Sequence, residues 1–269
     1  MVFRLYPNPT APRAAAVAES VRALLAARGQ RVIGAGDPCK ADVLVPVGGD
    51  GTVLRAVRAC WPECPPVWAI NAGHVGYLTE CEPEQVRESL EMLLAGKYRI
   101  ERRVVLEGEL KTDQIRRFFA LNEITVHRAA RLYCLRLRLS VDDKPILRFA
   151  GDGMLIATPT GSTAYNLSCG GPVLLPEADE MAITPICPQG FARIPLVVPG
   201  GSRIRLEAEP SPNFSEGVPA LVIDGAVSIP FEKGTVTCSR AEGSIGFIRT
   251  FDQSFYERLQ SRFARSREV

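Results

Sequence analysis

The chain has 269 residues, and its 32 Lys and Arg against 30 Asp and Glu give a formal net charge of +2 at pH 7. Hydrophobic residues make up 46% and charged residues 23%, as in ordinary globular proteins, and arginines occur as scattered pairs such as Arg102-Arg103. This pattern argues against a nucleic-acid partner. No apolar stretch is long enough to span a bilayer, and the N-terminal one is too short for a signal peptide, so we expect a cytoplasmic protein without a membrane partner.

The first hundred residues alternate strand-like and helix-like segments, which is typical of parallel βαβ units. The expected strands are 2–6, 31–33, 43–47 and 67–70, and the expected helices are 14–28, ended by Gly29, and 84–95. We therefore predict a parallel α/β domain at the N-terminus.

A Gly-rich turn, Gly48-Gly49-Asp50-Gly51-Thr52, follows the third of these strands and precedes a helix start. This arrangement lets backbone N–H groups approach phosphate oxygens. A carboxylate inside the turn, Asp50, would repel phosphate unless it accepts a proton from a hydroxyl or holds a magnesium ion. The turn thus indicates phosphoryl transfer, with an ordinary turn and a solvated Asp as the alternative. A second Gly-punctuated loop, 71–77, follows the next strand, and two such loops at strand ends favour a nucleotide site.

After about residue 100, apolar and polar residues alternate with a period of two, as in 135–141 and 204–209, which predicts half-buried strands. Asp142-Asp143 and Asp224-Gly225 are typical turn residues. The stretch 251–265 returns to helical spacing, with Phe255, Leu259 and Phe263 every four residues. We expect a Rossmann-like parallel α/β domain of residues 1–100 plus about 245–269, a mainly β domain of residues 101–244, and a C-terminal helix packing back on the first domain.

Within the β region, a buried strand at 154–157 leads into a hydroxyl-rich loop and a helix start at Ser162 to Tyr165. Exposed amides, hydroxyls and an aromatic face suit a nucleoside with its phosphates. Ser162 and Thr163 are also candidates for ordinary helix capping, and neither role excludes the other. Asn122-Glu123, after 118–121, offers an amide for an adenine edge and a carboxylate for a ribose diol, or is a plain polar turn.

Eight cysteines are spread without a repeating spacing, and we expect them to be reduced. Cys60 and Cys64 form the one close pair. Because His74 and His127 stand singly, we predict no metal site made by protein side chains.

Taken together, these motifs resemble the bacterial NAD kinase family. The matching segments are Gly48 to Thr52, Asn71 to Leu78, Asn122-Glu123, Thr158 to Tyr165 with Gly170-Gly171-Pro172, and the C-terminal Phe255 to Leu259. Their order and approximate spacing match over essentially the whole chain. The Gly48 to Thr52 turn is shared with diacylglycerol and sphingosine kinases, whereas the segment Thr158 to Tyr165 is specific.

The resemblance implies transfer of the terminal phosphoryl group of ATP, with Mg²⁺, to the 2′-hydroxyl of the adenosine ribose of NAD. It implies that Asp50 accepts the hydroxyl proton, that Gly48, Gly49, Gly51 and Thr52 form the phosphate loop, and that the enzyme is a homodimer or homotetramer. Asn122 and Glu123 would hold adenine and ribose, Asp152 the nicotinamide side, and Tyr165 would stack on a ring. The full NAD set implied is Asp50, Gly51, Arg55, Tyr77, Asn122, Glu123, Asp152, Thr163, Ala164, Tyr165, Asn166, Leu167 and Ser168.

Some positions depart from the family pattern. Ala150 stands where a basic residue is common, Ala226 where Gln is common, Gln189 where His is common, and Tyr77 where Phe is usual. Arg193 lies one position before the place where the family pattern has an arginine in this loop. These changes concern the nicotinamide side and the choice of phosphoryl donor and leave Asp50 in place.

Three other functions fit parts of this sequence less well. A lipid kinase of the diacylglycerol type needs a route for an acyl chain, and the polar 158–168 segment fits a dinucleotide better. A catalytically silent dinucleotide sensor would not need Asp50. A Rossmann dehydrogenase is disfavoured because no Gly-x-Gly-x-x-Gly opens a helix after the first strand.

Overall fold

The computed structural model describes residues 1–73, 76–129, 134–190, 193–210 and 218–265. The chain divides into two compact units, Met1–Arg102 with Ile245–Val269, and Arg103–Ser244. Among the described residues, no helix is long and apolar enough to cross a membrane.

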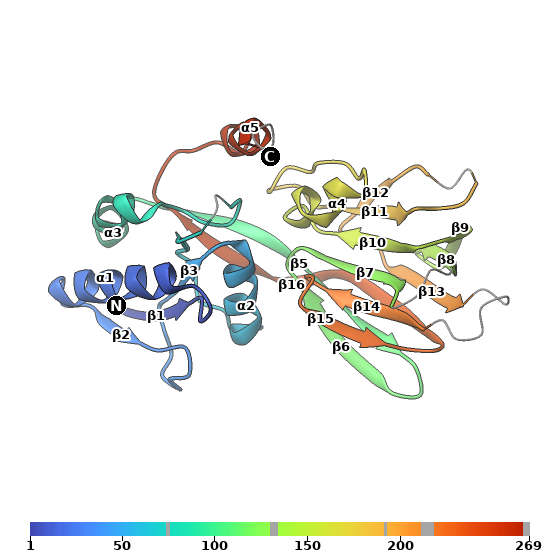
Figure 1. The fold of residues 1–269 in the computed structure, drawn as a ribbon, viewed down its shortest axis with the longest axis horizontal. Coiled ribbons are helices and arrows are strands. Elements are labelled where there is room, and N and C mark those ends of the chain that lie inside the picture. The colour runs from blue at the N-terminus through green and yellow to red at the C-terminus, as the bar shows by residue number, and fades with distance from the viewer. Residues whose placement is uncertain (74–75, 130–133, 191–192, 211–217, 266–269) are drawn as a thin grey trace. The chain divides into compact units, whose positions relative to one another are not determined.

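The first unit contains a parallel sheet in the order β2-β1-β3-β4 (Figure 1). Its strands are β1 (Val2–Pro7), β2 (Arg31–Ile33), β3 (Val43–Gly48) and β4 (Ile70–Asn71), and its helices are α1 (Pro12–Ala27), α2 (Asp50–Cys60) and α3 (Val86–Leu94), the last preceded by the 3₁₀ turn η1 (Pro83–Gln85). The predicted alternation of strands and helices is confirmed. The strand expected at 67–70 is shorter, and Val67 forms isolated bridges to Leu44 and Phe247 instead.

Helix α1 shows why these segments fold as they do. Its buried residues, Ala14, Ala18, Val21 and Leu25, recur every three or four positions and so lie on one face of the helix. That face packs into a core with strand residues such as Phe3. Gly29, with a φ of 67°, follows the helix and allows the chain to turn away.

The strand order places the carboxyl ends of β1 and β3 side by side. In the strand order, the chain passes from β1 to β2 at one edge of the sheet, and from β3 to β4 at the opposite edge. The two ends are joined by a hydrogen bond of 2.9 Å from the Asn8 N–H to the Val47 carbonyl. Open α/β sheets bind ligands at such a reversal of strand order. The turn Gly48 to Thr52 therefore lies where this fold places a ligand.

The second unit is built from two six-stranded sheets, in the orders β12-β11-β10-β7-β14-β15 and β6-β5-β16-β13-β8-β9. Their bounds are β5 (Arg99–Lys111), β6 (Ile115–Ala120), β7 (Glu123–Arg128), β8 (Leu135–Val141), β9 (Lys144–Gly151), β10 (Gly153–Ala157), β11 (Glu180–Ile186), β12 (Leu196–Pro199), β13 (Ile204–Pro210), β14 (Pro219–Ile223), β15 (Val227–Pro230) and β16 (Gly234–Arg249). Two short helical segments, η2 (Gly161–Thr163) and α4 (Tyr165–Ser168), follow β10.

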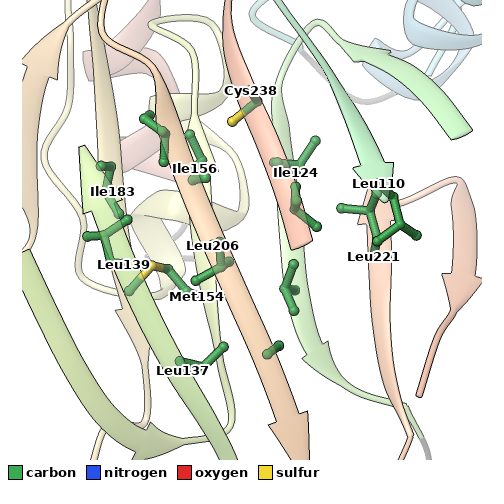
Figure 2. Close-up of a cluster of buried hydrophobic side chains, with 14 of the residues drawn as sticks. Leu110, Ile124, Leu137, Leu139, Met154, Ile156, Ile183, Leu206, Leu221 and Cys238 are labelled. Atoms are coloured by element: carbon green, nitrogen blue, oxygen red, sulfur yellow. The ribbon is translucent and has the colours of Figure 1, made fainter. Parts of the chain in front are cut away.

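A hydrophobic core lies between these two sheets (Figure 2). It contains Leu137 and Leu139 of β8 and, from the other sheet, Met154 and Ile156 of β10. The alternation along 135–141 and 204–209 is confirmed as β8 and β13, which pair antiparallel. At the β8–β9 turn both Asp142 and Asp143 have positive φ, as a two-residue hairpin requires.

The C-terminal segment belongs to the first unit. Ile248 lies in the core of that unit, and α5 (Phe255–Arg265) places the ring of Phe255 6.3 Å from the ring of Tyr77, centroid to centroid. This confirms the expected return of the C-terminal helix. The side chain of Phe263, expected on the same face, lies outside the described part.

A buried ion pair anchors this returning segment. The Arg249 side chain is fully buried, and its guanidinium donates to Glu101 Oε1 at 2.9 and 3.1 Å and to Glu80 Oε2 at 3.2 Å. The other oxygen of Glu80 accepts the N–H groups of Thr250 and Phe251 at 2.7 and 2.9 Å. One buried cation thus contacts two buried carboxylates from different segments of the unit, and Glu101 also accepts a hydrogen bond of 3.4 Å from the exposed Arg99.

We expect Arg249→Met to lower the free energy of unfolding by about 3–5 kcal/mol, because it removes the buried cation from Glu80 and one of the cations from Glu101. Arg22→Met, on α1 of the same unit, removes an exposed pair with Glu19 and is expected to lower it by at most about 1 kcal/mol. Both tryptophans, Trp61 and Trp68, lie in the first unit, so tryptophan fluorescence during urea unfolding reports on that unit. Equal losses in the two variants would contradict the anchoring role of Arg249.

Candidate active site

Asp50 is the first residue of α2 and directly follows β3, with Gly49 as the N-cap. Its carboxylate accepts two backbone hydrogen bonds, from the N–H of Tyr77 to Oδ2 and from the N–H of Leu78 to Oδ1, both at 3.0 Å. These bonds fix the orientation of the carboxylate. A carboxylate has about four lone-pair sites, so two remain for a ligand hydroxyl.

The loop after β4 approaches Asp50 closely because of Gly76. A Cβ atom at Gly76 would lie 2.0 Å from Asp50 Oδ1, so a side chain there would force the loop or the Asp50 carboxylate to shift. Glycine is thus required for the next two amides to reach the carboxylate. The sequence predicted this loop as part of a site, but it did not single out Gly76. His74 and Val75 lie outside the described residues.

Arg249 supports the same loop from behind. Its Nη1 donates to the carbonyls of Leu78 and Thr79, at 3.4 and 3.2 Å, while the N–H of Leu78 binds Asp50. The backbone of residue 78 therefore connects the buried guanidinium to the Asp50 carboxylate. Sequence reasoning missed Arg249, since nothing local distinguishes it from other strand arginines.

The predicted phosphate loop packs tightly at Gly48 and Thr52 and is bonded to Arg55 outside it. Gly48 has a φ of 156°, and a Cβ there would lie 2.4 Å from Thr52 Oγ1. Thr52 is buried, and its hydroxyl accepts a hydrogen bond of 3.2 Å from Arg55 Nη2. Arg55 also donates to Asn8 Oδ1 at 3.3 Å, which brings in a residue that the sequence analysis did not select. The free N–H groups in the first turn of α2, an 11-residue helix, favour an anion.

Tyr77 contributes its backbone to this site. Its side chain is 8% exposed and packs against Phe255 of α5, while its N–H donates to Asp50. The contact of Tyr77 with NAD stays a prediction, and the described contacts of Tyr77 are its N–H with Asp50 and its ring with Phe255.

In the second unit, Asn122 and Glu123 form a positioned pair. Glu123 begins β7, and Asn122 directly precedes it. The carboxylate of Asp224 accepts the N–H groups of Leu121, Asn122 and Glu123 at 3.2, 2.8 and 3.3 Å. Asn122 lies in the bend between β6 and β7, whereas Glu123 is a buried strand residue, so the plain polar turn describes only the first residue of this dipeptide. The sequence predicted Asp224 only as a turn residue, and its positive φ of 48° agrees with that prediction. Its second role, as the acceptor of these three N–H groups, was not predicted.

The side chain of Glu123 is in an unusual environment. The residue is 6% exposed, and its Oε2 atom is buried without a hydrogen-bond partner. Burial, together with the neighbouring Asp224 carboxylate, raises the pKa of Glu123 to about 8. A buried oxygen without a hydrogen bond destabilises the fold unless it is protonated or a ligand donates a hydrogen bond to it. This makes Glu123 a candidate for direct ligand contact.

The hydroxyl-rich segment after β10 is a scaffold packed against Asn122. Thr158 donates its N–H to the Asn122 carbonyl at 2.9 Å and its hydroxyl to the Leu121 carbonyl at 2.6 Å. A Cβ at Gly161 would lie 2.0 Å from the same Asn122 carbonyl, so glycine permits this close packing. The two predicted motifs of this unit are thus brought into direct contact.

Ser162, Thr163 and Asn166 point their polar atoms inward. Ser162 Oγ bonds the Pro159 carbonyl at 2.7 Å and the Leu174 N–H at 3.0 Å, and Thr163 Oγ1 bonds the Thr160 carbonyl at 3.4 Å. The expected helix capping by Ser162 and Thr163 is wrong, because Ala164 is the N-cap of α4 and no side chain caps it.

Asn166 is fully buried, donates to the carbonyls of Ser162 and Pro172, and accepts from Thr184 Oγ1 at 2.7 Å. In contrast, the Tyr165 side chain is 47% exposed, Ser168 is exposed, and Ala164 and Leu167 are half-buried.

Asp152 is held at the start of β10 by Arg128 of β7, whose Nη2 lies 3.0 Å from Asp152 Oδ2. Near it, two of the residues that depart from the family pattern contact each other, since the N–H of Gln189 donates to the Ala150 carbonyl at 2.7 Å. The Gln189 side chain also donates to Cys134 Sγ at 3.1 Å. These two departures therefore form one local structure.

Across the described ranges, no three His, Cys, Asp or Glu side chains lie together in a group that could hold a metal ion.

Two family profiles match the chain, the ATP-NAD kinase N-terminal domain over residues 9–98 and the ATP-NAD kinase C-terminal domain over residues 121–250. The NAD kinase of Wolinella succinogenes is 36% identical over 228 residues, covering 84% of this chain and 77% of the relative. The NAD kinase of Moorella thermoacetica is 38% identical over 224 residues, covering 82% and 71%.

Solved structures give the same result. The NAD kinase from Archaeoglobus fulgidus in complex with ATP matches with a TM-score of 0.78 and 27% identity over 100% of this chain and 98% of the other. Yeast NADH kinase complexed with NADH, at 24% identity, shares the fold with a TM-score of 0.87 over 98% and 87%. With both profiles matched and relatives above 35% identity over most of its length, the chain belongs to the NAD kinase family.

Proposed function

We propose that the chain carries out the reaction of its family with Asp50 as the proton acceptor. In this reaction the terminal phosphoryl group of ATP passes to the 2′-hydroxyl of the adenosine ribose of NAD, and NADP is formed. The observation that carries the proposal is the fixed Asp50 carboxylate, which has lone pairs to spare at the start of α2.

Phosphoryl transfer depends mainly on positioning and on neutralising charge. The backbone N–H groups at the start of α2 suit the transferred phosphate, and Asp50 suits the ribose hydroxyl, whose proton it takes as the oxygen attacks phosphorus. Mg²⁺ enters in this proposal as part of the MgATP substrate and neutralises phosphate charge when bound. We also propose a cytoplasmic homodimer or homotetramer.

Residues of the second unit are proposed to bind NAD. Asn122 would meet the adenine edge, Glu123 a ribose oxygen, and the exposed ring of Tyr165 would stack on a base. Asp152, held by Arg128, would face the nicotinamide side. Thr163 and Asn166, whose side chains are bonded internally, would support these contacts from behind. The proposed NAD set is completed by Gly51, Arg55, Tyr77, Ala164, Leu167 and Ser168.

Asp50→Asn is expected to lower kcat by about 10²- to 10⁴-fold and to leave NAD affinity nearly unchanged, because the amide keeps the shape but cannot take the proton. Turnover is measured as NADP formed from NAD and MgATP, read by an NADP-specific dehydrogenase, and affinity by calorimetry. Asp113→Asn, in an exposed turn, is the control and should match the wild type.

If NAD affinity fell as much as kcat, Asp50 would mainly position the ribose. If the wild-type chain bound NAD but formed no NADP from ATP, the silent sensor would be the correct function.

Gly76→Ala is expected to lower kcat by about 10- to 100-fold, since its Cβ would displace the loop whose amides bind Asp50. Losing a hydrogen bond to a charged group costs about 1.5–3 kcal/mol, which corresponds to this factor in rate. Gly73→Ala is the matched control, because a Cβ there meets its nearest neighbour, the Gly49 nitrogen, at an ordinary 3.8 Å. The same NADP assay measures both, and equal rates in the two variants would refute the role of Gly76.

The raised pKa of Glu123 has a consequence for stability. Between its ordinary value of 4.5 and about 8, the folded state keeps a proton that the unfolded chain has lost. Stability therefore falls as pH rises through this window, by at most about 1.4 kcal/mol per pH unit.

Glu123→Gln should remove this dependence, so we expect the wild type to lose more thermal stability than Glu123→Gln between pH 5.5 and pH 8. Melting without nucleotide, followed by circular dichroism, measures the difference. Glu107→Gln, exposed on β5, should retain the pH dependence of the wild type. Parallel pH curves for wild type and Glu123→Gln would contradict the protonated state.

A further inference from the structure

Asn8 lies in the loop between β1 and α1, directly after the last residue of β1. Its N–H donates to the Val47 carbonyl of β3 at 2.9 Å, which ties the loop to the strand that leads into the phosphate loop. Its side-chain Oδ1 accepts from the Thr10 N–H at 3.2 Å and from the Thr10 hydroxyl at 3.0 Å. These bonds form an Asx turn, which is an ordinary structural use of asparagine.

The same oxygen of Asn8 also contacts a side chain of α2. Arg55 donates through Nη2 to Asn8 Oδ1 at 3.3 Å and to Thr52 Oγ1 at 3.2 Å. The Thr10 N–H and the Arg55 guanidinium can only donate, so the atom of the Asn8 amide that both of them meet is its oxygen. Asn8 therefore does more than form a turn, because it also fixes one end of the Arg55 guanidinium.

The guanidinium of Arg55 is held beside the phosphate loop. A Cβ at Gly51 would lie 4.0 Å from Arg55 Nη1, which places this group next to the first turn of α2. In the part of the chain that the structure describes, Arg55 forms no ion pair with a carboxylate, and its Nε and Nη1 groups have no acceptor. A cation with N–H groups to spare, next to backbone amides that favour an anion, is complementary to a phosphate group.

The way in which Arg55 is held suits this contact. Arg55 is exposed, and an exposed arginine loses rotamer freedom when it binds a ligand. The bonds to Asn8 and Thr52 remove part of that freedom beforehand, and they use only Nη2, so the other N–H groups can bind phosphate oxygens. Because both acceptors are neutral, the positive charge of the guanidinium is not cancelled.

We propose that Asn8 is a positioning residue, which orients the Arg55 guanidinium for contact with a phosphate group of a bound nucleotide. This role rests on the proposed kinase reaction and adds to it a residue outside the sets predicted for phosphate and NAD. Both substrates of that reaction carry phosphate, NAD in its pyrophosphate and ATP in its triphosphate, and Arg55 can meet either with the same charged contact.

The test measures the affinity of the full chain for NAD alone and for MgATP alone by calorimetry. For one of the two nucleotides, we expect Asn8→Ala to weaken binding about fivefold and Arg55→Ala about 10- to 100-fold, as for the loss of a hydrogen bond and of a charged contact. A loss confined to NAD assigns the contact to its pyrophosphate, and a loss confined to MgATP assigns it to the triphosphate.

Two comparisons show whether Asn8 acts through Arg55. The double variant Asn8→Ala with Arg55→Ala should bind no more weakly than Arg55→Ala alone, because Asn8 has nothing left to orient. Gln30→Ala is the matched control, since this amide of the same unit bonds Met1 and Arg28 instead, and it should bind like the wild type.

Asn8→Asp separates the positioning role from the Asx turn. Aspartate forms the same turn, so we expect thermal unfolding, followed by circular dichroism, to match the wild type. Its negative charge would pair with Arg55 and cancel the charge offered to phosphate, so the affinity should fall at least as far as in Asn8→Ala.

Wild-type affinity in Asn8→Asp would mean that Asn8 serves the turn alone, and additive losses in the double variant would mean that it contacts the nucleotide itself. Unchanged affinity for both nucleotides in Asn8→Ala would remove the role altogether. Each of these results overturns the proposal. Failure of the proposed function is distinguishable, because a wild-type chain that binds nucleotide without forming NADP refutes the kinase reaction while its Asn8 and Arg55 variants still test the phosphate contact.

Discussion

The first unit depends on one buried cation. Arg249 neutralises Glu80 and Glu101, and the same guanidinium binds the carbonyls of Leu78 and Thr79. Buried charges of this kind are costly unless every one is paired, so the segments that carry them have little freedom to shift independently. The N–H of Leu78 also binds Asp50, the proposed proton acceptor. The same short stretch of backbone therefore contacts the buried cation through its carbonyls and orients the Asp50 carboxylate through its N–H.

The second unit uses a buried carboxylate in a comparable way. Asp224 collects three consecutive backbone N–H groups, and this fixes the peptide planes on both sides of Asn122. Thr158 and Gly161 pack on the carbonyl of the same residue. The hydroxyls of Thr158, Ser162 and Thr163, which the sequence analysis assigned to a ligand, form hydrogen bonds within the region itself.

Local patterns predicted the features that have local causes. Strict alternation identified β8 and β13, and the strand–turn–helix signal located Asp50. The partners of the site residues escaped prediction because their contacts span 27 residues for Tyr77 with Asp50, 102 for Asn122 with Asp224, and 170 for Thr79 with Arg249. The direction of individual side chains could not be predicted from the sequence either. The Thr163 hydroxyl bonds the Thr160 carbonyl, and the ring of Tyr77 packs against Phe255 of α5.

The insertion of one unit within the other sets an order for folding during synthesis. The unit Arg103–Ser244 has all of its residues before the ribosome reaches Ile245. The first unit must wait for Ile248 and Arg249, since one fills its core and the other neutralises its buried acids. The unit that begins first along the chain is therefore completed last, and until then Glu80 lacks the guanidinium with which it pairs in the folded unit.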